Sequence, residues 1–140
     1  ENDHFASGEN ERIVSWRGWK IQLQICYDLR FPEIVRNRVE ENNTPAYDLI
    51  VYVANWPEKR AAHWNALLKA RAIENQSYVV GVNRVGEDAN GFTYSGDSQI
   101  IDALGGTTSL TPKEEVVQTH VINSLNLQKI REMLPFLCDL

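Results

Sequence analysis

A cysteine stands where a strand-like pattern changes into a helix-like one. Residues 21 to 25 alternate apolar and polar side chains up to Cys26, as a half-buried strand does. From Phe31 the apolar spacing becomes helical, and Pro32 suits the first turn of a helix that we expect to run to about Glu40. A thiol at such a corner lies beyond the carboxyl end of the strand, beside backbone N–H groups that can stabilise an oxyanion. The pattern therefore predicts a nucleophile elbow with sulfur in place of a serine oxygen.

The thiol must be deprotonated before it can attack an unactivated amide. Its ordinary pKa is about 8.5, so little thiolate exists at neutral pH without a base and a positive charge nearby. Lys20 cannot supply that charge, because six strand residues place it about 20 Å from the sulfur. Lys59 and Lys69 fall on a predicted helix, where a solvated position is more common. The alternative for Cys26 is a small buried hydrophobic residue.

Polar side chains around the predicted elbow have structural interpretations. Asp28, Arg30 and Glu33 can form a buried network that fixes the turn, with Arg30 as a forked donor. Proton transfer by one of the two acids is the alternative. The backbone N–H of Tyr27 is the simplest donor to an oxyanion formed at Cys26.

A second group of candidates follows the next strand. Asn55 and Trp56 end an apolar run that begins at residue 47, so they would lie at the same end of a parallel sheet as Cys26. Trp56 could form the wall of a substrate pocket with Tyr27 and Phe31 near it. The alternative is that Trp56 packs in the core.

The remaining pattern predicts an α/β domain with a mixed sheet. A hairpin with a turn at Arg17-Gly18 opens the sheet, residues 84 to 91 form a loop, and Ser124 caps a last helix. The expected strands are 13–16, 19–25, 47–56, 78–82, 98–103 and 116–122, the last two forming an antiparallel pair, and the expected helices are 32–40, 57–75 and 124–134.

Composition narrows the function classes. The chain has 140 residues, 43% hydrophobic and 24% charged, which is ordinary for one globular domain. A net charge of −5 with interspersed signs argues against nucleic acid as a partner, and no apolar run approaches a membrane span. The three histidines show no metal-ligand spacing. Two cysteines make no disulfide framework, so we expect a reducing, cytoplasmic location.

Several of these motifs together resemble one known family. CYDLRFPE, residues 26 to 33, resembles the nucleophile motif of the nitrilase superfamily, the carbon–nitrogen hydrolases. Within the superfamily, the NWP after the strand, the RAIENQ helix end and the GDSQIID strand resemble the omega-amidase branch most closely. The resemblance runs from Glu1 to about Asp102. It implies a four-layer αββα sandwich, of which residues 1–140 would be the carboxy-terminal half.

The resemblance also implies an activity. Cys26 would form a thioester with a small-molecule amide, without cofactor or metal, and the amide would be 2-oxoglutaramate or 2-oxosuccinamate. Glu1 would be the second active-site glutamate, the alternative being a loop acid, while the family's lysine and first glutamate would precede residue 1. The segment alone would then be catalytically incomplete. Family members are commonly homodimers, which suggests an interface near residues 71 to 76.

Three alternatives stay open at this point. Another nitrilase-superfamily amidase, an N-carbamoyl amidohydrolase or a nitrilase would share the elbow. A non-catalytic assembly module could keep the fold without the chemistry. A redox-active thiol protein would need Cys138 as the partner of Cys26. The sequence does not identify the residue that binds the far carboxylate of the substrate.

Overall fold

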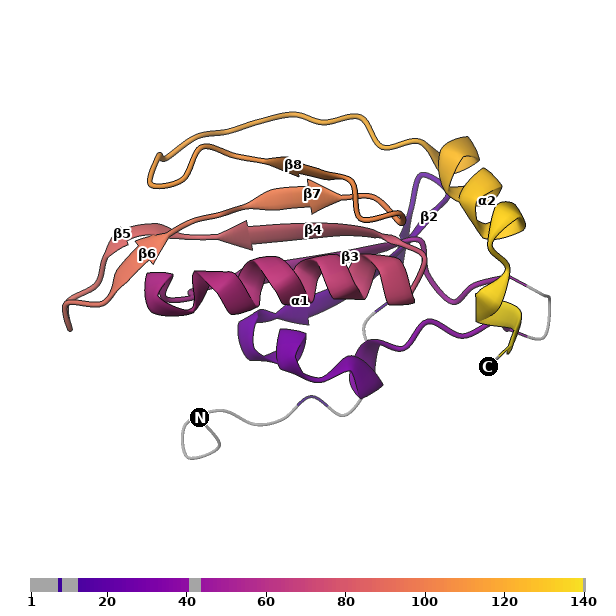
Figure 1. Cartoon of the computed structure of the whole chain (residues 1–140), viewed down its shortest axis with the longest axis horizontal. Coiled ribbons are helices and arrows are strands. Elements are labelled where there is room, and N and C mark those ends of the chain that lie inside the picture. The colour runs from indigo at the N-terminus through magenta and orange to yellow at the C-terminus, as the bar shows by residue number, and fades with distance from the viewer. Residues whose placement is uncertain (1–7, 9–12, 41–43, 140) are drawn as a thin grey trace.

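One mixed β-sheet organises the chain (Figure 1). The computed structural model describes residue 8, residues 13–40 and residues 44–139. The six strands lie in the order β1-β2-β3-β4-β7-β8, and β2, β3 and β4 are parallel while the outer pairs are antiparallel. The strands are β1 (Ile13–Trp16), β2 (Trp19–Ile25), β3 (Leu49–Ala54), β4 (Tyr78–Asn83), β7 (Gln99–Ile101) and β8 (Thr107–Ser109). The predicted α/β class with a mixed sheet is confirmed.

The three parallel strands end together. Ile25 of β2 is opposite Val53 of β3, and Ala54 of β3 is opposite Asn83 of β4. We call this side, where the chain leaves β2, β3 and β4, the carboxyl end of the sheet. The elbow lies here because it follows β2 directly.

The helix α1 (Ala61–Glu74) covers one face of the sheet, after a 3₁₀ turn at Glu58–Arg60. It buries Trp64 and Leu68 against a core that includes Ile50 and Val79. Gly81 of β4 provides the room for this packing, since a Cβ built there would lie 2.8 Å from Trp64 Cζ2 and closer still to Leu68 Cδ1. The predicted long helix is therefore confirmed, with its sheet contact made at a glycine.

The other face of the sheet is apolar and partly open. Side chains alternate along a strand, so the apolar residues of β2 face away from α1 while Gln22 and Gln24 are buried on the α1 side. Toward the carboxyl end, Leu23, Ile25, Val53 and Val82 are 44%, 66%, 49% and 48% exposed. An apolar sheet face of this kind normally packs against a second layer.

A second helix covers the opposite end of that face. α2 (Ser124–Met133) packs Leu127 against Leu49 and Tyr78, and a 3₁₀ turn at Phe136–Asp139 follows it. The predicted cap is one residue off: Asn123, not Ser124, accepts a hydrogen bond from Asn126 N at 3.1 Å. In the part of the chain that the structure describes, no helix is long and apolar enough to cross a membrane.

The predicted helix over residues 32–40 is wrong. Only short 3₁₀ turns form, at Cys26–Arg30 and Pro32–Val35, and Arg36 is extended. The reason is Asn37, which is fully buried and bonded outside its own segment. Its N–H donates to Asn75 Oδ1 at 2.8 Å and its side chain to Tyr47 O at 3.0 Å. These tertiary bonds replace the helical ones.

Two further expectations in the second half of the chain are corrected. The predicted loop 84–91 contains β5 (Val85–Glu87), which pairs with β6 (Thr93–Ser95) in a hairpin. Residues 116–122 form no strand, because β8 already occupies the free edge of β7 directly after the Gly105-Gly106 turn. The 116–122 segment runs back toward α2 instead, with Val117 and Val121 almost fully exposed.

Candidate active site

The elbow places Cys26 directly after β2, at the start of the 3₁₀ turn. Its φ is +37°, a left-handed conformation that β-carbon-bearing residues seldom adopt. Asp28 supports the turn, since its Oδ2 accepts a hydrogen bond from Ile25 N at 2.9 Å. The predicted structural role of Asp28 is consistent with this bond, and the left-handed cysteine is what a nucleophile elbow requires.

The elbow rests on α1. Leu29 is fully buried, and its carbonyl accepts a hydrogen bond from Arg71 Nη2 at 2.6 Å. The guanidinium of Arg71 also pairs with Glu74 at 2.8 Å. Beside it, burial raises the pKa of the Tyr52 phenol, which therefore stays protonated. A homodimer interface is predicted near residues 71 to 76. Four of these residues are buried inside the chain itself: Arg71, Ala72, Asn75 and Gln76.

The predicted buried network of Asp28, Arg30 and Glu33 is wrong. Arg30 stacks its guanidinium over the Trp56 ring, 4.5 Å from the centroid, and lies 6.0 Å from the Tyr27 centroid. Glu33 is exposed and, among the described residues, has no hydrogen bond or ion pair. It follows Pro32 on the outer side of a short 3₁₀ turn, which aims its carboxylate at solvent.

The predicted substrate-binding residues divide into exposed and buried ones. Tyr27 and Phe31 are exposed and make an edge-to-face contact with ring centroids 5.2 Å apart. Asn55 is exposed at the carboxyl end of β3. Trp56 is only 3% exposed: its ring packs on Trp64 at 5.6 Å and its Nε1 donates to a backbone carbonyl. Core packing accounts for Trp56, and contact between these four residues and a substrate stays a prediction.

Asn83 is a residue that sequence reasoning missed. Its Oδ1 accepts from Trp56 N at 2.7 Å, and its Nδ2 donates to Trp56 O at 3.0 Å and Gly96 O at 2.9 Å. Asn83 thus fixes the loop after β3 and the loop after β6 at the carboxyl end. A signal was available, because Asn83 follows a buried strand just as Asn55 does.

We expect Asn83→Ala to lower the free energy of unfolding by about 2 kcal/mol, because it leaves three buried backbone groups without partners. Asn83→Asp should cost more, since a carboxylate would face two carbonyl oxygens. Urea unfolding measures both, and Asn55→Ala is the exposed control, within about 0.5 kcal/mol of wild type. Equal free energies of unfolding for Asn83→Ala and Asn55→Ala would contradict the role of Asn83 in fixing these two loops.

The β5–β6 hairpin carries a second missed group. Tyr94 is largely buried, and its hydroxyl donates to Asp88 Oδ2 at 2.9 Å. This bond raises the pKa of Tyr94, as do burial and the charges of Asp88 and Cys26. The pKa of Asp88 is lowered, chiefly because Phe92 N donates to its carboxylate at 3.0 Å. Tyr94 is therefore a hydrogen-bonded phenol in the hairpin that follows β4.

Glu1 lies outside the described residues, so its predicted role stays a prediction. No group of three or more potential metal ligands occurs among residues 8, 13–40 and 44–139. Cys26 and Cys138 are both unbridged. They lie at opposite ends of the sheet, since Cys138 borders a cavity shared with the first residues of β2. The redox-pair alternative therefore has no geometric support.

Comparison with known proteins identifies the family. The family model described as carbon–nitrogen hydrolase matches residues 1–133. The chain belongs to the carbon–nitrogen hydrolase family. The resemblance carried by CYDLRFPE and the downstream strands is thereby confirmed.

Individual carbon–nitrogen hydrolases extend the comparison. The chain is 49% identical over 140 residues to "Omega-amidase YafV" of Yersinia enterocolitica, covering 99% of this chain and 52% of that protein. It is 38% identical to a 2-oxoglutaramate amidase of Paenarthrobacter nicotinovorans, covering 96% of this chain and 45% of that protein. The crystal structure of XC1258 from Xanthomonas campestris, a CN-hydrolase superfamily protein with an arsenic adduct in its active site, superposes with a TM-score of 0.96 at 43% identity, covering 99% of this chain and 53% of that one. The chain thus spans about half the length of the relatives it matches.

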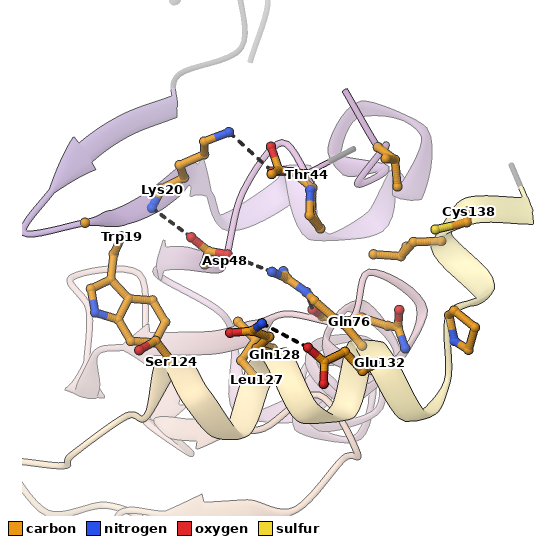
Figure 2. A pocket seen from close by; sticks show the side chains of 16 residues that line it. Trp19, Lys20, Thr44, Asp48, Gln76, Ser124, Leu127, Gln128, Glu132 and Cys138 are labelled. Atoms are coloured by element: carbon orange, nitrogen blue, oxygen red, sulfur yellow. Dashed lines mark hydrogen bonds and ion pairs between the residues drawn. The ribbon is translucent and has the colours of Figure 1, made fainter. Parts of the chain in front are cut away.

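A cavity of about 800 Å³ lies between α2 and the starting ends of the parallel strands, and Cys26 is not among the residues that line it (Figure 2). Several of its polar groups bind one another: Asp48 accepts from Lys20 N at 3.1 Å and pairs with Arg131 at 2.7 Å, while Gln128 donates to Glu132 at 2.9 Å. These contacts tie α2 to the starting ends of the parallel strands. Since ligands of parallel sheets bind at the carboxyl ends, the elbow stays the candidate site.

Proposed function

We propose that the complete protein hydrolyses the amide bond of 2-oxoglutaramate or 2-oxosuccinamate and that residues 1–140 are the carboxy-terminal half of its domain. The observation that carries the proposal is the cysteine at a left-handed elbow in a chain 49% identical to an omega-amidase. Cys26 directly follows β2 at the carboxyl end of the sheet, the end at which parallel sheets bind their ligands, and this position supports its role as the nucleophile.

The open sheet face supports the half-domain part of the proposal. Leu23, Ile25, Val53 and Val82 form an exposed apolar patch on the face opposite α1. The matched relatives are about twice as long as this chain, and their additional residues are the natural cover for this face. Covering it with a second sheet would give the four-layer αββα sandwich.

The reaction follows from a thiol nucleophile. Cys26 Sγ bonds to the amide carbonyl carbon, and the resulting oxyanion accepts hydrogen bonds from backbone N–H groups such as that of Tyr27. The C–N bond then breaks, and the nitrogen leaves as ammonia with the proton that the general-base glutamate took from the Cys26 thiol. Water adds to the thioester, the C–S bond breaks, and the carboxylic acid and the thiol are released. By the resemblance, the lysine and the general-base glutamate come from upstream of residue 1.

The complete polypeptide tests this function through ammonia release from a panel of substrates. We expect 2-oxoglutaramate or 2-oxosuccinamate to give the highest kcat/KM, above a simple aliphatic amide, an N-carbamoyl amino acid and a nitrile. A preference for one of the other three classes would move the protein to another branch. No turnover of any of them by folded protein would favour the non-catalytic module. A homodimer and a cytoplasmic location stay predictions.

A further inference from the structure

Arg84 lies at the carboxyl end of the sheet, next to Asn83, which fixes the loops after β3 and β6. Its backbone N–H donates to Ala54 O at 3.3 Å, which continues the β3–β4 ladder by one residue. Neighbouring strands lie about 4.8 Å apart, so the backbone at Cys26 and that at Asn83 are separated by about 10 Å. Cys26 and Arg84 therefore lie at the same end of the sheet, two strands apart.

The guanidinium of Arg84 is stacked on Tyr94 of the β5–β6 hairpin. Its Cζ lies 4.6 Å from the centroid of the Tyr94 ring. Tyr94 is only 8% exposed and is held by its hydrogen bond to Asp88. Figure 1 shows β5 and β6 continuing beyond the end of β4, away from α2. The stack therefore fixes the plane of the guanidinium at the end of the sheet where Cys26 lies.

Most of the donors of Arg84 are unused within the described chain. One nitrogen, Nη2, donates to Glu87 O at 3.3 Å, and no described carboxylate lies within ion-pair distance of the guanidinium. Asp88 is occupied by Asn90 N, Phe92 N and the Tyr94 hydroxyl.

Acidic residues border a cavity beside Arg84. Asp97, Glu114 and Glu115 line a cavity of about 420 Å³ together with Arg84, yet none of them pairs with it. By contrast, Lys113 at the same end of the sheet is neutralised by Glu58 at 2.7 Å.

We propose that Arg84 binds the far carboxylate of an acidic amide substrate whose amide carbon is attacked by Cys26. The inference rests on the proposed function and names the specificity-determining residue of that site. A guanidinium stacked on an aromatic ring keeps its edge free, and that edge matches a carboxylate with two parallel hydrogen bonds. An amide with no second carboxylate gains nothing from this contact.

The test compares two substrates in the complete polypeptide. We expect Arg84→Gln to lower the ratio of kcat/KM for 2-oxoglutaramate to kcat/KM for pentanamide by about 10- to 100-fold, mostly through KM, as for loss of a charge-assisted hydrogen bond. Arg84→Lys keeps the charge and should recover part of the ratio. Arg17→Gln is the matched control, because Arg17 stacks on Trp16 with 5.2 Å from Cζ to the ring centroid, at the other end of β2.

The outcomes separate the two proposals. Wild-type preference for 2-oxoglutaramate with an unchanged ratio in Arg84→Gln overturns the role of Arg84 and leaves the proposed function standing. Equal losses on both substrates would make Arg84 structural and also overturn it. A wild type that does not prefer 2-oxoglutaramate overturns the proposed branch and, with it, this inference. If Arg84→Gln does not fold, as judged by circular dichroism, Arg84→Lys decides, and an unchanged ratio there overturns the inference.

Discussion

Cys26→Ala is expected to abolish amide turnover by the complete polypeptide, lowering kcat by about 10⁴-fold or more. The reason is that the oxyanion donors and the substrate contacts survive, but no covalent intermediate can form. Ammonia release under saturating substrate measures the effect. Cys138→Ser is the matched control, because Cys138 is exposed and lies at the opposite end of the sheet. We expect it to keep activity within about twofold.

The strained backbone at Cys26 can also be tested through protein stability. At φ +37°, alanine pays the same backbone cost as cysteine, while glycine does not. Cys26→Gly should therefore be as inactive as Cys26→Ala but more stable by about 1 kcal/mol. Residual turnover in both variants, or a less stable glycine variant, would contradict the elbow described above.

Gly81→Val is expected to lower the free energy of unfolding by about 3 kcal/mol. A valine side chain at this position would overlap Trp64 and Leu68, which are fully buried under α1. Urea unfolding of the complete polypeptide measures the loss. Gly8→Ala is the control, since no atom of the described residues lies within 4 Å of a Cβ built at Gly8. It should change stability by less than about 0.5 kcal/mol.

A double variant shows whether the overlap with Leu68 is the cause. Leu68→Ala alone should cost about 3 kcal/mol, because it opens a cavity in the core. In the double variant, the valine at position 81 fills part of that cavity. The combined loss should then be at least about 1 kcal/mol smaller than the sum of the two single losses. Strict additivity would mean that Gly81 and Leu68 do not share this space.

The sequence predicted the centre of the fold well because its signals are local. β2, β3 and β4 are apolar runs bounded by turns, and α1 has helical spacing over four turns. The corner at Cys26 was visible because one strand pattern ends there. These features depend on residues that are neighbours in the chain.

The wrong secondary-structure predictions lie where contacts between residues far apart in the sequence determine the backbone conformation. The helix predicted for 32–40 is replaced by hydrogen bonds from Asn37 to Asn75 and Tyr47, which no local pattern announces. Residues 116–122 have a strand-like sequence, but β8 pairs with the edge of β7 that they would have occupied. Local propensity loses to tertiary contacts in both cases.

The same limit applies to the candidate site. Cys26 and Asn55 were predicted at one end of the sheet from strand ends alone. Arg84 and Tyr94 were missed because they fall in and after a Gly- and Asp-rich stretch that reads as a loop. Only the β5–β6 pairing and the Arg84–Tyr94 stack bring them together at the carboxyl end.

The most direct test of the central claim is mass spectrometry of the complete polypeptide quenched in acid during turnover of 2-oxoglutaramate. We expect the peptide that contains Cys26 to carry an acyl group whose mass is that of the substrate minus ammonia. An acyl group on another residue, or an unmodified Cys26 peptide while ammonia is being released, would contradict Cys26 as the nucleophile.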